Sequence, residues 1–374
     1  MRWGSFSLVV ACLVACASVS FAAPMYNIVN IGTVQAGDSA SQGFRVSPNG
    51  IGTGRSVGSG TAQAFSWTQG GGIVGLPNLA SPARPFSVGN GVNNAGIVVG
   101  TGATTLFGSS PLPLMWQGGV VSQVPMPAGQ TLGRANDINS SNVIIGSVNS
   151  GSNEIGFIAS GANSSVISAL GPGGTFLRTA FAINDAGTVV GFGIDPGNAA
   201  RNVGFVYNSV NNTATEVPPL PGFNGALAFD VSEAGHIVGS SMLNQGSGLP
   251  FIWTSGGGTV AVPLAAGTSQ GSARGVNSNG WVVGTDSSAF AIPFLYDGTQ
   301  TYRLQDLIPA GTGWDLSTNT SSSALGISED GIIVGTGVFN GQVRAYAMIP
   351  IPEPGSVVAA IGAGASLLLR RRHD

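Results

Sequence analysis

Hydrophobic and polar positions along the chain follow a short pattern that recurs with a nearly constant period. The clearest copy, residues 92–100, reads VNNAGIVVG, and residues 183–191 read INDAGTVVG. The copies close on Gly54, Gly100, Gly146, Gly191, Gly239, Gly284 and Gly335, which follow one another at intervals of 45 to 51 residues. A polar turn with glycine before an apolar run is typical of a tight hairpin between two strands. Self-similarity at this period indicates a repeat architecture.

A second apolar segment follows each copy, and after a turn comes one more short apolar strand. Residues 64–67 (AFSW) and 250–253 (PFIW) are examples of the former, and residues 73–76 (IVGL) of the latter. Each period therefore predicts four strands. Four strands in about 46 residues favour an all-β fold, a seven-bladed β-propeller over residues 23–349, whose unalternating Ile-Val-Val runs suit strands buried on both faces. The alternative is a β-solenoid, although its coils usually need fewer residues.

The chain has one apolar strand too many at its start and one too few at its end. Residues 26–31 (YNIVNI) precede the first repeat, whereas the seventh repeat ends at Met348 without an outer strand. We predict that residues 26–31 complete the last blade. This pairing would join the two ends of the repeat array and remove an exposed strand edge.

The repeats resemble the bacterial extracellular repeats of the HAF family, named after a His-Ala-Phe triplet. The resemblance covers nearly all of residues 26–348 and rests on the small turn before Val-Val-Gly. The triplet itself is not kept: residues 63–65 read QAF, 249–251 LPF, 292–294 IPF and 344–346 RAY. Because the histidine is absent from these positions, none of its roles is carried over.

The first 22 residues predict an export signal. Arg2 precedes an apolar stretch at residues 8–17, and residues 20–22 (SFA) place small side chains where signal peptidase cleaves. We expect the Sec translocon and signal peptidase as partners, with cleavage after Ala22. Residues 13–16 (LVAC) also resemble a lipobox, and that alternative implies lipidation of Cys16.

Residues 350–374 have three parts: a Pro-Glu-Pro motif, an uncharged stretch at 355–369, and an arginine cluster. The motif and cluster residues are Pro352, Glu353, Pro354, Arg370, Arg371 and Arg372. This tail resembles the PEP-CTERM sorting signal of Gram-negative bacteria. The resemblance implies recognition by an exosortase and delivery to the cell surface or the extracellular matrix. Fifteen residues at about 1.5 Å each fall short of a ~30 Å hydrocarbon core, which favours transient membrane insertion; a retained membrane tail is the alternative.

Composition narrows the possible functions. Only 8% of residues are charged, all thirteen basic residues are arginine, the net charge is −3 and the pI is about 5.3. A nucleic-acid partner is therefore excluded, because binding needs a basic face. Both cysteines, Cys12 and Cys16, lie in the export signal. We accordingly expect neither disulfides nor a thiolate metal site in the mature chain.

Few residues have the chemistry of a catalytic site. The two histidines are His236, which we expect on a surface strand, and His373 in the tail, so a Ser–His–Asp triad or a metal site is not expected. Three acidic residues share one turn position in different repeats and are expected to be solvated on one rim. They are Asp185, Glu233 and Glu329.

One set of charges is predicted to line the channel. Arg45, Asp137 and Asp230 precede the first apolar residue of their repeats, on the strand expected innermost. Propellers commonly bind ligands at one channel mouth, so these three residues are the candidate ligand site; the alternative is a salt-bridged lining without a ligand. In each repeat, the residue immediately before this position is expected to face the opposite side of the strand. Among them are Asn90, Asn136 and Arg274.

Three functions remain open at this stage. The resemblance of the tail implies a surface or matrix protein that binds or scaffolds exopolysaccharide. A carbohydrate-active propeller enzyme and a purely structural repeat protein are the alternatives. Scarce charge and histidine favour a protein that is not an enzyme and needs no cofactor, although fold alone does not decide function.

Overall fold

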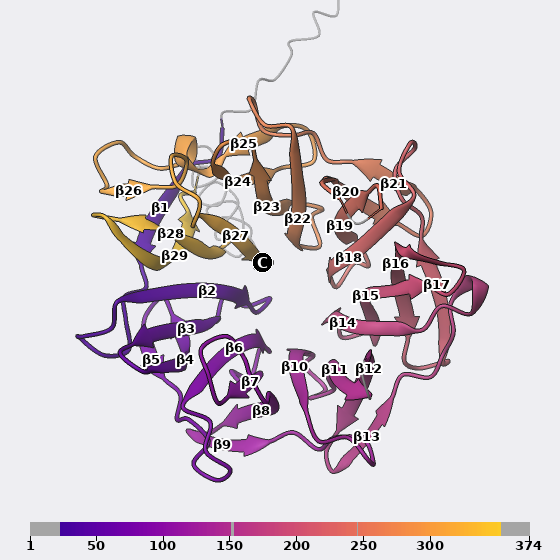
Figure 1. The fold of residues 1–374 in the computed structure, drawn as a ribbon. Coiled ribbons are helices and arrows are strands. Elements are labelled where there is room, and N and C mark those ends of the chain that lie inside the picture. The colour runs from indigo at the N-terminus through magenta and orange to yellow at the C-terminus, as the bar shows by residue number, and fades with distance from the viewer. Residues whose placement is uncertain (1–22, 151–152, 245, 353–374) are drawn as a thin grey trace, which may run out of the picture.

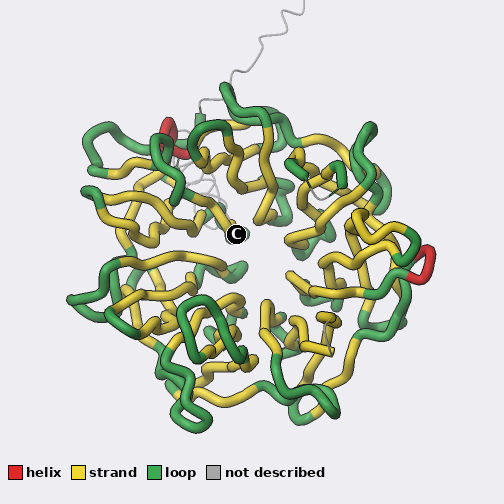
Figure 2. The backbone as a smooth tube through the Cα atoms, viewed as in Figure 1, coloured by secondary structure: helices red, strands yellow, loops and turns green. Residues whose placement is uncertain are grey.

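The computed structural model describes residues 23–150, 153–244 and 246–352. The signal residues, including Cys16 and Ala22, lie outside this part of the chain, as do Glu353, Pro354 and the arginine cluster at 370–372; of the sorting residues, Pro352 is described. The fold is a β-propeller: antiparallel sheets stand around a common centre, with the chain passing from one sheet to the next (Figure 1). Loops and turns lie at the ends of the strands (Figure 2). None of the described helices is long and apolar enough to cross a membrane.

Each of the first six sequence repeats forms four successive antiparallel strands, as predicted. The first two repeats contain β2 (Ala40–Val46), β3 (Gly52–Gly58), β4 (Thr61–Thr68), β5 (Gly72–Gly75), β6 (Phe86–Val92), β7 (Val98–Ala103), β8 (Leu112–Gln117) and β9 (Val120–Gln123). The next two contain β10 (Gly133–Ile138), β11 (Ile144–Ser150), β12 (Asn153–Ser160), β13 (Asn163–Val166), β14 (Leu177–Ile183), β15 (Thr188–Asp195), β16 (Asn198–Asn208) and β17 (Thr213–Val217). The fifth and sixth contain β18 (Gly225–Val231), β19 (Ile237–Met242), β20 (Gly248–Thr254), β21 (Gly258–Ala261), β22 (Gln270–Val276), β23 (Val282–Ser287), β24 (Ala291–Tyr296) and β25 (Thr301–Arg303).

The last sheet is built differently from the others. It contains β1 (Tyr26–Asn30), β26 (Trp314–Asp315), β27 (Ser323–Ile327), β28 (Ile333–Phe339) and β29 (Gln342–Pro350). β1 pairs with β29 along its whole length, from Tyr26 opposite Pro350 to Asn30 opposite Tyr346, as the sequence predicted. The short β26 and the 3-10 helix η2 (Leu304–Leu307) were not predicted. They occupy the longest interval between closing glycines.

The strand ladder of each repeat is separate from those of its neighbours, except that the first two repeats are joined. A single parallel bridge between Ala62 and Phe86 connects β4 to β6, so these repeats count as one eight-stranded sheet. A second short 3-10 helix, η1 (Pro172–Gly174), lies between β13 and β14. Neighbouring sheets pack through apolar clusters. Ile145 of β11, for example, shares a cluster with Leu177 and Phe205 of the following sheet.

The closing glycine of each repeat is required by a close backbone approach. A Cβ built on Gly239 would lie 1.9 Å from the Leu227 carbonyl oxygen of the innermost strand and 2.7 Å from the ring of Phe251. Phe251 lies directly opposite Gly239 in the register of β19 and β20 and is fully buried. A Cβ built on any of the other closing glycines would lie 1.9 to 2.1 Å from a carbonyl oxygen of its own inner strand. Only glycine allows the inner strand and a large third-strand side chain to meet this closely.

The innermost strand of each repeat contains a register shift of one residue. In β10, for example, the ladder skips Asn136 between Ala135 and Asp137, and in β18 it skips Phe229 between Ala228 and Asp230. The extra residue forms a bulge, which turns its side chain away from the neighbours it would otherwise join. The equivalent bulge residues are Phe44, Asn90, Asn136, Phe181, Phe229, Arg274 and Leu325.

Deletion of residues 26–30 should destabilise the protein more than removal of an exposed loop of equal length. The deletion removes the β1–β29 ladder, whose hydrogen bonds each contribute about 0.5–1.5 kcal/mol, and the fully buried side chain of Tyr26. We expect the free energy of unfolding to fall by about 3 kcal/mol or more. Chemical denaturation measures it, with deletion of residues 105–109 as the control. Equal stability of the two deletions would contradict this role for β1.

Candidate functional site

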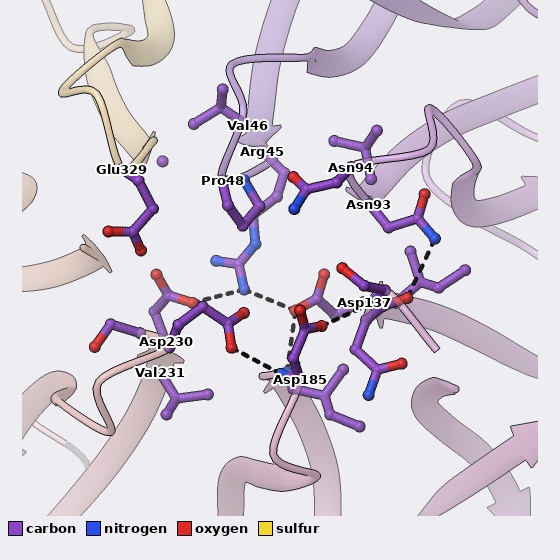
Figure 3. Close-up of a pocket in the computed structure, with 18 of the residues that line it drawn as sticks. Arg45, Val46, Pro48, Asn93, Asn94, Asp137, Asp185, Asp230, Val231 and Glu329 are labelled. Atoms are coloured by element: carbon purple, nitrogen blue, oxygen red, sulfur yellow. Dashed lines mark hydrogen bonds and ion pairs between the residues drawn. The ribbon is translucent and has the colours of Figure 1, made fainter. Parts of the chain in front are cut away.

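The turns between the first and second strands of the repeats gather at one mouth of the central channel (Figure 3). An asparagine in several turns both shapes its own turn and bonds the next one. Asn93 Oδ1 accepts hydrogen bonds from the N–H groups of Ala95 and Ile97, at 3.1 Å each, while its Nδ2 donates to the carbonyl of Asn139 at 3.1 Å. Asn139 and Asn184 donate onward to the next turn in the same way. Neighbouring sheets are thus tied together at this mouth.

Asp185 and Glu233 are exposed, as predicted, and Glu329 is half-buried, but all three acidic turn residues also have structural partners. Asp185 Oδ1 accepts a hydrogen bond from the Ser140 N–H at 2.7 Å, and Glu233 Oε2 accepts one from the Asp185 N–H at 2.9 Å. Glu329 accepts from both the N–H and the hydroxyl of Ser278. Each carboxylate therefore satisfies the turn of the preceding sheet. The sequence missed this role because the partners lie about one repeat away.

The structure brings all three predicted channel residues together. Arg45 reaches from β2 across the channel, and its Nη2 lies 3.1 Å from Asp137 Oδ2 and 2.7 Å from Asp230 Oδ1 (Figure 3). Each aspartate also accepts a backbone hydrogen bond from the following sheet, Asp137 from Ile183 N–H and Asp230 from Val276 N–H, both at 3.0 Å. This geometry is the salt-bridged lining that the sequence had left as the alternative.

Burial and charge act against each other in this cluster. Burial tends to lower the pKa of Arg45, but the negative charges of Asp230 and Asp137 outweigh it and raise that pKa. Burial raises the pKa of Asp230 to about 6, although the guanidinium of Arg45 opposes the shift. The side chains are only 14%, 7% and 11% exposed for Arg45, Asp137 and Asp230. Removing one partner would therefore leave an uncompensated buried charge.

Little space remains at this mouth. The hollow bordered by Arg45, Asp137 and Asp230 measures about 60 Å³. Ligand pockets for small molecules usually measure roughly 300–1,000 Å³, whereas one water occupies about 30 Å³ of the liquid. The arrangement suits a few waters and a structural ion pair better than a sugar.

Other candidate groups also have structural surroundings. His236 is half-buried, and its Nδ1 lies 3.4 Å from the carbonyl of Asn277 in the neighbouring turn. Asp286, which the sequence did not single out, is fully buried, and its Oδ2 accepts a hydrogen bond from the Ala265 N–H at 2.7 Å. Burial raises the pKa of Asp286 to about 7. Within the described ranges, no group of three or more His, Cys, Asp or Glu side chains is placed to hold a metal ion.

The bulge residues form a second set of links between sheets. Asn90 Nδ2 donates to the carbonyl of Ala135 at 2.9 Å, and Asn136 Nδ2 donates to that of Ala180 at 2.7 Å. Arg274 instead lies over the ring of Phe229, with its guanidinium carbon 3.9 Å from the ring centroid. The repeat positions separate these residues from Arg45 and the aspartates, but they did not predict the aromatic partner of Arg274.

The chain is similar to several solved structures at low sequence identity. The β-propeller domain of the Trilobed protease from Pyrococcus furiosus is 12% identical, with a TM-score of 0.40 over 69% of this chain and 79% of that chain. TolB from Acinetobacter baumannii is 11% identical, with a TM-score of 0.39 over 78% of this chain and 76% of that chain. A mutant Trypanosoma rangeli sialidase displaying trans-sialidase activity is 13% identical, with a TM-score of 0.36 over 87% of this chain and 54% of that chain. No family model and no curated protein matches the sequence.

Replacing Arg45 by methionine should destabilise the protein strongly, because it leaves Asp137 and Asp230 buried without a cation. We expect a loss of about 3–5 kcal/mol in the free energy of unfolding. The triple variant R45M/D137N/D230N should recover most of this loss, since each amide oxygen still accepts its backbone hydrogen bond. Urea denaturation of the two variants and the parent measures both effects. An R45M variant as stable as the parent would show that the ion pairs do not stabilise the channel.

Proposed function

We propose that the protein is an exported, exosortase-sorted β-propeller of the cell surface or extracellular matrix. In this proposal it binds or scaffolds exopolysaccharide and performs no catalysis. Its N-terminal signal directs export, and the Pro-Glu-Pro tail is recognised by the exosortase after transient membrane insertion. The sorting signal and the HAF-type repeats rest on the sequence patterns described above.

We also propose that the propeller has seven blades and is closed into a ring by β1. The first six sequence repeats each supply four antiparallel strands, and in the seventh β1 adds the outer strand beside β29. The first and last repeats also contact each other. The Ala345 N–H donates to Ser41 Oγ at 3.0 Å, and the Glu329 N–H donates to the carbonyl of Pro48 at 3.0 Å. Both contacts support closure between β2 and the last sheet.

The observation that carries the non-catalytic proposal is that three ionisable groups of the channel mouth are bonded to one another. Arg45 neutralises Asp137 and Asp230, and both aspartates accept backbone hydrogen bonds. A general acid or base must reach the substrate proton within hydrogen-bond distance. Side chains that form ion pairs with each other beside a hollow of about 60 Å³ suit a stabilising role instead.

The positions of the two described ends suit a protein that is processed at both. β1 and β29 run side by side, and the Ile351 N–H donates to the carbonyl of Met25 at 2.8 Å. In the sequence, Ala22 lies shortly before β1, and the Pro-Glu-Pro motif begins shortly after β29. Cleavage at both places would leave the β1–β29 ladder intact.

Protein extracted from the cell surface tests this function in two measurements. Its intact mass should lack the first 22 residues and the segment beyond Pro354. The same material should bind exopolysaccharide of the producing cell without hydrolysing it. A mass that retains residues 370–374 would contradict sorting, and turnover of the polysaccharide would favour the alternative of a carbohydrate-active enzyme. Neither binding nor turnover would leave a purely structural repeat protein.

A further inference from the structure

A stack of aromatic rings ends on an arginine. It lies toward the end of the channel opposite the turns that join the first and second strands of each repeat. Phe192 and Phe181 lie 5.7 Å apart in a stacked arrangement, and Phe181 lies 5.4 Å from Phe229. The guanidinium of Arg274 lies over the ring of Phe229, the last ring of this series. The stack extends from β15 and β14 through β18 to β22, which are neighbours around the centre (Figure 1). The inner-strand bulges place Phe181, Phe229 and Arg274 in this line.

A hollow of about 250 Å³ opens beside Phe229 and Arg274. It is four times larger than the hollow at the opposite mouth and approaches the lower end of ligand pockets, roughly 300 Å³. Small polar side chains form much of its remaining lining. They are Ser240, Ser247, Gln270, Ser272, Thr285 and Ser287. One aromatic face, one cation and several hydroxyl groups thus surround a space of the size of a sugar unit.

The cation in this hollow is oriented but not neutralised. Arg274 Nε donates to Ser272 Oγ at 3.0 Å, which fixes the plane of the guanidinium. Among the described residues Arg274 forms no ion pair; the four pairs present there involve Arg45 and Arg201. The hydroxyl of Thr285, which also lines the hollow, is buried without a hydrogen-bond partner in that part of the chain. Arg274 therefore keeps donors beside the hollow that no described residue occupies, whereas Thr285 Oγ1 is an unpartnered atom buried in the wall of the hollow.

We propose that the hollow between β18 and β22 binds an acidic sugar unit of a polysaccharide, with Arg274 holding its carboxylate and the ring of Phe229 supporting the cation. This inference rests on the proposed polysaccharide-binding function and specifies its ligand as a uronate. The planar guanidinium matches a carboxylate through two parallel hydrogen bonds, and the surrounding hydroxyls suit a sugar ring. Burial lowers the pKa of Arg274, as expected for a cation without an anionic partner.

A second hollow at the same end has a similar lining. It measures about 200 Å³ and contains two arginines and two phenylalanines, among them the nearly fully exposed Phe107. The four residues are Arg55, Phe86, Phe107 and Arg134. A polymer with repeated acidic units would find a second cationic and aromatic position there, which favours a polysaccharide over a small acid.

Calorimetric titration of the full mature chain with oligogalacturonate tests the proposal. The carboxyl-reduced oligomer and a 6-sulfated oligomer of the same length are the comparison ligands. We expect the parent to bind oligogalacturonate at least about 10-fold more tightly than the reduced oligomer, since a charge-assisted hydrogen bond contributes about 1.5–3 kcal/mol. Equal affinity for the reduced oligomer, or tighter binding of the sulfated one, would overturn the assignment of a carboxylate.

Arg274→Gln should weaken binding of oligogalacturonate about 10-fold and leave binding of the reduced oligomer unchanged. Arg274→Lys keeps the charge without the planar fork and should bind with intermediate affinity. Arg344→Gln is the matched control, because it removes the same charge outside both hollows. Thermal melting establishes that each variant is folded. Parental affinity in R274Q would overturn this site while leaving the proposed function standing, whereas a parent that binds no saccharide would overturn both.

Discussion

The fold depends on one close contact that each repeat makes within its own sheet. The closing glycine of the second strand lies against the carbonyl of the bulged inner strand and faces a large side chain of the third strand. In six of the seven repeats that side chain is aromatic; Leu114 takes the place in the second. The absence of a Cβ lets the three strands pack at a distance that any other residue would prevent. Because the contact recurs, the three inner strands of every repeat pack in a similar way.

Links between neighbouring sheets then define the two ends of the channel. At one end, turn asparagines and acidic side chains bond from sheet to sheet, and Arg45 joins Asp137 and Asp230 across the centre. At the other end, the bulge residues make these links through amides and stacked rings. The first end is closed by mutually satisfied groups, whereas the second retains an oriented cation beside open space. The proposed polysaccharide site therefore lies at the second end, and we expect the ion pairs of the first end to contribute to stability.

The repeat period, the turn glycines and the apolar runs are local signals, so they were sufficient to predict the strands and the pairing of residues 26–30 with the end of the array. Arg45, Asp137 and Asp230 share one repeat position, which placed them together on the channel. Their ion pairs could not be predicted, because these depend on distances across the channel. The stack on Phe229 was also missed, since a one-residue bulge changes the face that a side chain occupies and leaves no mark in the sequence.

The most direct test of this account is the stability of a Gly239→Ala variant. The added methyl group must displace the Leu227 carbonyl or the Phe251 ring, both of which are held in the sheet. We expect the free energy of unfolding to fall by about 1–3 kcal/mol. Gly70→Ala is the control, because nothing lies within 4 Å of the position of its Cβ. Chemical denaturation should show a large loss for G239A and little change for G70A; equal stability of the two variants would contradict the account.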